Sequence, residues 1–138
     1  HEIQVSVTSV NNVIYSGAYF GLTRFDGKNW NTWTVKDPDS GLPSDFINVV
    51  KLSPDGKTVA IGTDKGLCLY NHDLGTWTTY RRNRSGPGGE LVKFKNGVWK
   101  TEQVSQAPAG DFIWSVEFQG DKMWVGTSTG LYSASLTW

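Results

Sequence analysis

The sequence contains few of the residues from which metal, redox and nucleic-acid sites are built. Cys68 is its one cysteine, and His1 and His72 are its two histidines among 138 residues. A lone cysteine excludes an intrachain disulfide, a CxxC redox pair and a cysteine-rich zinc site, and Cys68 within "LCLY" is predicted to be a small buried apolar residue. The formal net charge is zero, which argues against nucleic acid as a partner, because that binding depends on clustered lysine and arginine.

Long apolar runs and catalytic patterns are also missing. No stretch approaches the length that crosses a membrane as a helix, so membrane insertion is not expected. No Gly-x-Ser-x-Gly nucleophile motif occurs, and His72 lies beside Asp73 in a predicted exposed turn. Two metal alternatives arise: a copper site at an amino-terminal His1 with His72 as its second ligand, and a calcium site at the two carboxylates of "DPDSG", residues 37–41. The "DPDSG" loop lacks the regular alternation of oxygen ligands of an EF-hand, so a turn before the next strand is favoured. The sequence otherwise predicts no catalytic residue, no metal and no cofactor.

Tryptophan and glycine are abundant instead, with seven and sixteen copies. Helical periodicity is not visible anywhere in the chain. Short alternating runs rich in valine, isoleucine, threonine, tyrosine and tryptophan are separated by glycine, asparagine, aspartate and proline. This pattern is typical of strands joined by tight turns, so the predicted fold class is all-β.

Three stretches share the pattern glycine, threonine or alanine, two variable residues, then Gly-Leu. They read "SGAYFGLTRFDG", "IGTDKGLCLYN" and "VGTSTGLYSAS". Their paired glycines are always four residues apart, at Gly17/Gly21, Gly62/Gly66 and Gly126/Gly130. The pattern predicts an apolar strand, a short turn whose second glycine adopts positive φ without a Cβ clash, and a returning strand that begins at leucine.

Two further repeats complete the unit. "DFINVVKL" begins at Asp45 and "DFIWSVEF" at Asp111, and both predict a strand that precedes the Gly-Leu hairpin. "NWNTW", "TWTTY" and "VWKTE" each contain Trp-x-Thr, which places both residues on one face of a further strand. The unit is therefore four antiparallel strands. In the first copy its first strand is predicted at residues 3–10, with "NN" as the turn that follows.

A repeat of about 40 to 50 residues that forms four antiparallel strands is typical of a β-propeller blade. We predict one propeller segment over residues 1–138, with blades at about 2–36, 44–82 and 110–138 and an extra hairpin at 90–104. Three blades are fewer than a closed propeller needs, and open blade faces and edges favour association. The expected partners are further blades of the same protein, a second copy of the chain in a homo-oligomer, or a larger complex.

The second copy resembles the repeat of the two-component regulator propeller family. The residues that carry the resemblance are Gly41-Leu42-Pro43, Pro54-Asp55-Gly56 and the segment from Gly62-Thr63 to Gly66-Leu67. The third copy is similar from Gly126-Thr127 to Gly130-Leu131, whereas the first has Ala18 in place of threonine. The second copy also resembles a WD repeat, although the Gly-His and Trp-Asp dipeptides of that family are missing.

The resemblance implies a periplasmic or extracellular setting and a non-catalytic binding or structural module. Family members often serve as sensor regions, commonly for carbohydrate, so a carbohydrate-like ligand or a protein partner is implied for this chain. The alternative is an extracytoplasmic hydrolase or lyase that acts at the mouth of the propeller channel. That function needs convergent acid, base or metal groups, and the sequence has only scattered aspartate, glutamate and lysine.

Propeller geometry predicts a binding site where the turns between second and third strands meet the starts of the first strands. The residues predicted to lie there are Tyr19, Phe20, Asp45, Asp64, Lys65, Asp111, Trp114 and Ser128. Aromatic side chains beside polar groups can stack on a sugar ring or hold a partner's side chain. The alternative for Tyr19 and Phe20 is packing between blades, and Trp114 is predicted to face either the channel or the next blade.

Overall fold

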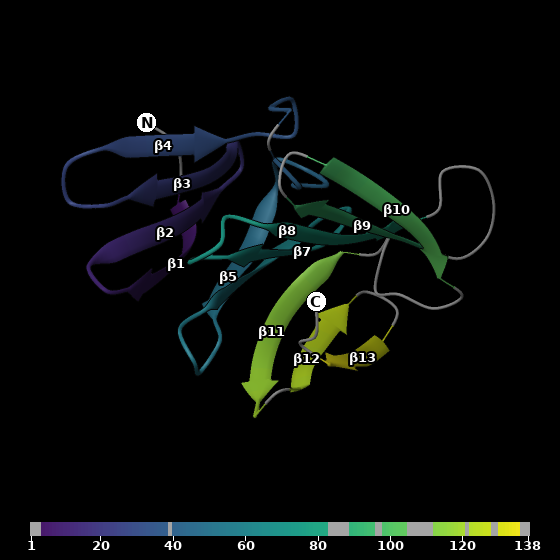
Figure 1. The fold of residues 1–138 in the computed structure, drawn as a ribbon. Coiled ribbons are helices and arrows are strands. Elements are labelled where there is room, and N and C mark those ends of the chain that lie inside the picture. The colour runs from purple at the N-terminus through teal and green to yellow at the C-terminus, as the bar shows by residue number, and fades with distance from the viewer. Residues whose placement is uncertain are drawn as a thin grey trace.

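The computed structural model of the chain describes residues 4–38, 40–82, 89–95, 98–104, 112–120, 122–127 and 130–135, with side chains at 6–38, 40–80, 112–120, 122–127, 131 and 133. Among these residues there are thirteen strands and no helix, arranged in three antiparallel sheets (Figure 1). The prediction of an all-β chain built from antiparallel blades is confirmed. The three sheets of the described residues do not close into a ring.

The first sheet contains the first four strands in chain order. They are β1 (Gln4–Val10), β2 (Val13–Ala18), β3 (Gly21–Phe25) and β4 (Trp30–Trp33). Asn11 and Asn12 join β1 to β2 with φ of 47° and 67°, which is the backbone that a two-residue hairpin turn with the twist of its strands requires. Gly21 opens β3 with φ of 115°, as the repeat pattern predicted for its second glycine.

The second sheet has six strands, because the extra hairpin continues it. Its strands are β5 (Ile47–Leu52), β6 (Thr58–Thr63), β7 (Gly66–Asn71), β8 (Trp77–Arg82), β9 (Gly89–Lys95) and β10 (Val98–Val104). They follow the order β10-β9-β8-β7-β6-β5, so β9 pairs with β8 at the outer edge of the predicted blade. The hairpin expected at 90–104 is thus an extension of the second blade.

The third sheet contains three described strands. They are β11 (Ile113–Gln119), β12 (Lys122–Thr127) and β13 (Gly130–Ser135), paired in chain order. The ladder from β11 to β13 repeats the ladder from β5 to β7, because Ile113 pairs with Thr127 as Ile47 pairs with Thr63. The repeats recognised in the sequence are therefore also repeats of strand register.

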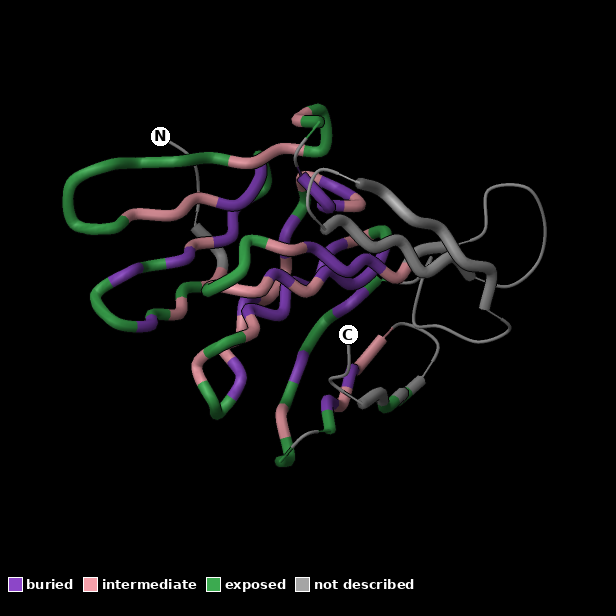
Figure 2. Tube along the Cα trace, in the orientation of Figure 1, coloured by how far each residue is buried: buried purple, intermediate pink, exposed green. Residues whose placement is uncertain are grey.

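The core consists of two apolar layers, one on each side of the second sheet. The first layer joins this sheet to the first and contains Ile61 and Cys68, and the second layer joins it to the third and contains Ala60 and Leu67. Neighbouring residues on a strand point to opposite faces, so β5, β6, β7 and β8 each contribute to both layers. Figure 2 shows the result, with the buried residues concentrated in the middle of the molecule.

In the first two sheets, the first glycine of the repeated pair lies directly against the next sheet, with no room for a side chain. A Cβ atom added to Gly62 would lie 2.5 Å from Ile113 Cγ2, and one added to Gly17 would clash with Ile47. Carbon atoms in favourable contact are about 3.5–4.0 Å apart, so only glycine leaves room. Ile47 and Ile113 belong to the two Asp-Phe-Ile stretches. The isoleucine of an Asp-Phe-Ile stretch in one sheet therefore packs on the first glycine of the glycine-pair repeat in the preceding sheet.

The Trp-x-Thr repeat is buried only where a neighbouring sheet covers it. In β8, Trp77 is 2% exposed and packs edge-on against Trp33 of the first sheet at 5.5 Å between ring centroids. Thr79 Oγ1 donates a hydrogen bond to the carbonyl of Gly41 in the connection between the first two sheets. Trp30 has the same place in β4 but is 71% exposed, because none of the described residues covers that face of the first sheet.

Alanine at the first glycine of the repeat should have different effects in different sheets. Gly62→Ala places a methyl group against Ile113 and should lower the free energy of unfolding by about 1–3 kcal/mol, the usual cost of overpacking. Gly126→Ala is the matched control, because its Cβ would approach only the hydroxyl of exposed Ser115, and should change stability by less than about 0.5 kcal/mol. Urea unfolding measures both variants, and equal losses would contradict the packing described.

The thiol of Cys68 is expected to be unreactive in the folded chain. It is fully buried, and burial raises its pKa from 9.0 to about 12, so little of the nucleophilic thiolate forms near neutral pH. A disulfide reagent at pH 8 should react only after urea is added. Because the folded state holds the thiol proton more tightly, the free energy of unfolding should fall as pH rises from 9 through 12. Cys68→Ala should reduce this decline, and rapid reaction of the folded chain at pH 8 would contradict the burial.

Candidate ligand-binding site

Two backbone hydrogen bonds bring the predicted site residues of the first two sheets together. The N–H of Gly21 donates to the carbonyl of Asp45 at 3.0 Å, and the N–H of Asp64 donates to the carbonyl of Phe46 at 3.2 Å. The segment that leads into β5 therefore lies between the β2–β3 turn and the β6–β7 turn. All of these residues lie at the same end of the sheets, because equivalent turns of antiparallel strands with the same register are aligned.

Aromatic side chains are exposed at this end. Tyr19 packs on Phe46 with ring centroids 5.6 Å apart, and both rings remain accessible to solvent. Phe20 is 61% exposed. Tyr19 thus contacts the segment that leads into the second sheet, while much of both side chains is exposed to solvent. Ligand binding by these two residues stays a prediction.

Trp114 owes its position to a β-bulge. The ladder between β11 and β12 shifts register between Ile113 and Ser115, and Trp114 is the extra residue. A bulged residue is left out of the pairing and its side chain is redirected. Trp114 is 58% exposed and stacks on Phe112, with ring centroids 5.4 Å apart and planes 12° from parallel. The two stacked rings place exposed apolar surface at the start of β11.

The same bulge in β5 ties the second and third sheets together. Asn48 is the extra residue there, and its Nδ2 donates to the carbonyl of Ile113 at 3.1 Å. This bond places the start of β11 beside the start of β5. The Phe112–Trp114 pair therefore lies at the same end of the sheets as Tyr19, Phe20 and Phe46. We call these five residues the aromatic end.

The charged residues predicted for the site have different roles. Asp45 Oδ1 accepts a hydrogen bond of 2.6 Å from the N–H of Val35, so its carboxylate closes the connection between the first two sheets. Asp64 Oδ1 is shielded from solvent, with no hydrogen-bond partner in the part of the chain that the structure describes. Lys65 is exposed beside it. Asp111 and Ser128 lie outside the described residues.

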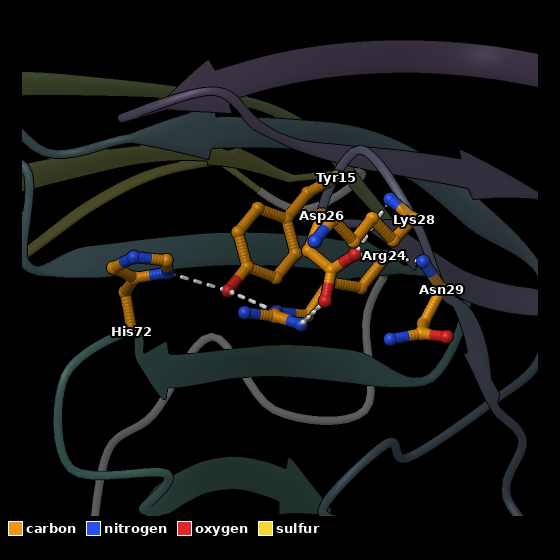
Figure 3. A network of polar contacts seen from close by, with 6 residues as sticks. All are labelled: Tyr15, Arg24, Asp26, Lys28, Asn29 and His72. Atoms are coloured by element: carbon orange, nitrogen blue, oxygen red, sulfur yellow. Dashed lines mark hydrogen bonds and ion pairs between the residues drawn. The ribbon is translucent and has the colours of Figure 1, made fainter.

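A separate polar network lies at the opposite end, between the first and second sheets (Figure 3). The buried Tyr15 hydroxyl shares a hydrogen bond of 2.7 Å with His72 Nδ1 and accepts one from Arg24 Nε at 3.3 Å. Arg24 also pairs with Asp26 at 4.0 Å. Burial raises the pKa of Tyr15, so its hydroxyl stays protonated and holds the sheets together. His72, expected in an exposed turn, is instead partly buried because this turn packs on the first sheet.

Sequence reasoning missed Phe46 and Phe112 as site residues. The signal for them was present, because each is the middle residue of an Asp-Phe-Ile stretch. Among the described residues, no group of histidine, cysteine, aspartate and glutamate is arranged to hold a metal ion. Nothing helical in the described ranges has the length and apolar character needed to span a membrane.

Comparison with known proteins identifies the fold. No protein-family model and no curated protein matches the chain. Among solved structures, it is similar to the extracellular domain of a putative hybrid two component system from B. thetaiotaomicron, with 19% identity and a TM-score of 0.56 over 99% of this chain and 24% of that one. It is also similar to the extracellular domain of a second such system from the same organism, with 18% identity and a TM-score of 0.50 over 94% and 20%. The chain thus spans about a fifth to a quarter of these structures, and at this identity the likeness shows a shared fold.

The contact made by Asp45 predicts a structural role for this residue. Asp45→Ala removes the acceptor for the Val35 N–H and should lower the free energy of unfolding by about 1 kcal/mol, the usual net contribution of a hydrogen bond. Asp45→Asn keeps an acceptor oxygen and should recover part of the loss. Lys65→Ala, an exposed neighbour, should change stability by less than about 0.5 kcal/mol. If Asp45→Ala unfolds in urea at the wild-type midpoint, its carboxylate is free for other roles.

Proposed function

We propose that this chain is a non-catalytic recognition segment of a β-propeller outside the cytoplasm, and that its aromatic end binds a carbohydrate-like ligand. The observation that carries the proposal is the gathering of five exposed aromatic side chains from three sheets at one end. Phe112 and Trp114 are stacked with nearly parallel planes and both stay exposed, and an exposed aromatic ring suits the apolar face of a sugar ring. Lys65 and Asp64 lie close to this surface and provide polar groups that orient a ligand.

The setting and the biological role rest on two independent supports. The repeat resembles that of the two-component regulator propeller family, whose members often act as sensors. The similar solved structures are extracellular domains of putative hybrid two component systems. Both support a periplasmic or extracellular module that detects a ligand, and we propose that family and that role for this chain.

The described side chains favour binding over catalysis. An enzyme of the hydrolase or lyase class needs an acid and a base that converge on one point. Asp45, beside the aromatic end, uses its carboxylate to accept the N–H of Val35. The other described polar groups there are Asp64, whose Oδ1 is shielded from solvent, and Lys65, which is exposed. Among the described residues, no hydrogen bond or ion pair joins either of them to Asp45 as an acid–base pair.

Replacement of Trp114 tests the proposed binding. The full chain is titrated with cellohexaose, maltohexaose and an oligogalacturonate, and binding is followed by calorimetry. For any sugar that binds, Trp114→Ala should weaken the affinity about tenfold, which equals about 1.4 kcal/mol and is of the size expected for a lost aromatic contact. Trp114→Phe should retain most of the affinity, because it keeps a ring that can stack.

Trp30 provides the matched control. It is a more exposed tryptophan than Trp114 but lies on the open face of the first sheet, away from the aromatic end. Trp30→Ala should leave sugar affinity unchanged. Equal losses for the two variants, or binding that is indifferent to Trp114→Ala, would contradict a ligand site at the aromatic end.

A further inference from the structure

The outer face of the third sheet has the same residue types, in the same register, as the face of the first sheet that packs on the second sheet. In the first sheet, Ser6 pairs with Gly17 and Gly17 with Leu22 across three adjacent strands. In the third sheet, Ser115 pairs with Gly126 and Gly126 with Leu131 in the same register. Paired residues of adjacent strands point to the same side of a sheet. We call Ser115, Gly126 and Leu131, with Trp124 beside them, the Gly126 face.

In the first sheet, the equivalent face is occupied by β5 of the second sheet, which shows the kind of strand that packs there. Ser6 Oγ accepts a hydrogen bond from the N–H of Val50 at 3.0 Å and donates one to its carbonyl at 3.2 Å. Gly17 provides the space filled by Ile47, and Leu22 is completely buried. One strand of the next sheet thus presents an isoleucine to the glycine and, three residues later, a backbone amide to the serine.

The second sheet repeats the same contact with a different residue in place of the serine. Its ladder reads Val49, Gly62 and Leu67. Ile113 of the third sheet packs against Gly62, and Leu67 is again fully buried. An isoleucine opposite the glycine is therefore the element common to both occupied copies.

The Gly126 face lacks such an occupant among the described residues. A Cβ added to Gly126 would approach only Ser115 of its own sheet. Leu131 is 69% exposed, whereas Leu22 and Leu67 are 0% exposed. The same three residue types that bury an isoleucine in the first sheet are thus open in the third.

We propose that the Gly126 face binds a further blade of the same type, whose first strand places an isoleucine opposite Gly126 and bonds its backbone to Ser115. Apolar contact of the isoleucine with the glycine backbone and with Leu131 would exclude water, as in the two occupied copies. The proposal concerns the face of a sheet and not its end, so it does not depend on the ligand proposed for the aromatic end.

A second copy of this chain does not provide that isoleucine. The strand position of Ile47 and Ile113 is the one that pairs with Thr63 and Thr127, and in the first sheet Gln4 holds it, paired with Ala18. A second copy that docked through its first sheet would bring a polar glutamine to a position built for an apolar side chain. Burying its amide without a partner is unfavourable.

The open face of the first sheet is otherwise suited to packing. Val7, Ile14, Phe25 and Trp30 line a hollow of about 480 Å³ on it. Val7 holds the strand position of Val50, since they pair with Ser16 and Ile61 in equivalent registers. Gln4 distinguishes this face at the position that packs on a glycine, and Ser9 distinguishes it at the position held by Leu52 and Phe118. Replacing Gln4 makes the occupant of the glycine position testable in the full chain.

Gln4→Ile converts the first sheet into the predicted occupant. Sedimentation velocity over a range of concentrations measures self-association of the full chain. The wild-type chain should associate weakly, and Gln4→Ile should raise the association constant at least tenfold. Adding Gly126→Val to Gln4→Ile should return association to the wild-type level, because the new side chain occupies the space opposite the glycine. Gly126→Ala is the milder second variant, and circular dichroism establishes that each variant is folded.

Thr32→Ile is the matched control. It adds the same side chain to the same open face of the first sheet, because Thr32 lines the hollow there, but it lies in β4 and away from the glycine position. Association of Thr32→Ile should be insensitive to both substitutions at Gly126. The proposal is overturned if Gln4→Ile associates no more strongly than Thr32→Ile, or if its association survives both Gly126 substitutions. A wild-type chain that already dimerises, and loses the dimer on Gly126→Val, would make a second copy the occupant.

Discussion

The packing of an isoleucine on a glycine is the contact on which the stacking of the sheets depends. Gly17 lies directly against Ile47 and Gly62 against Ile113, and an apolar layer fills the rest of each interface. A larger side chain at either glycine would push the two sheets of that interface apart and open the layer between them. A smaller one at the isoleucine would leave a cavity. Glycine and isoleucine therefore recur in the sequence because the same contact between neighbouring sheets recurs in the structure.

Regular stacking has a consequence for function. Because each sheet joins the next in the same register, the turns between second and third strands align at one end, beside the starts of the first strands. The polar residues of the bulges and turns reinforce this alignment, as Asn48 does when it bonds to the third sheet. Tyr15, Arg24 and His72 do the same at the other end. The rings at the aromatic end are thereby held by a scaffold whose own stability does not require them.

Several features of the fold were predictable from local patterns. Alternation, the paired glycines and the Asp-Phe-Ile stretches predicted the strands and their order, and Gly21 and Gly66 have the positive φ that the turns require. For the candidate site, the exposure of Phe20 and Trp114 agrees with their predicted places, and both remain candidates. The hydrogen bond of Asp45 could not be predicted from the sequence, because its donor is the N–H of Val35, ten residues away across a connecting segment. Phe46 and Phe112 were overlooked because a phenylalanine within an apolar run ordinarily indicates core.

The sequence by itself determined the secondary structure, since side-chain alternation and turn chemistry act over a few residues and do not depend on what packs above them. Only the tertiary structure decided which copies of a repeat are buried. Trp30 and Trp77 belong to the same motif, as do Leu131 and Leu67, yet one of each pair is exposed and the other is core. Whether a residue is buried depends on the presence of a neighbouring sheet, and the sequence of a strand does not specify whether such a sheet covers it.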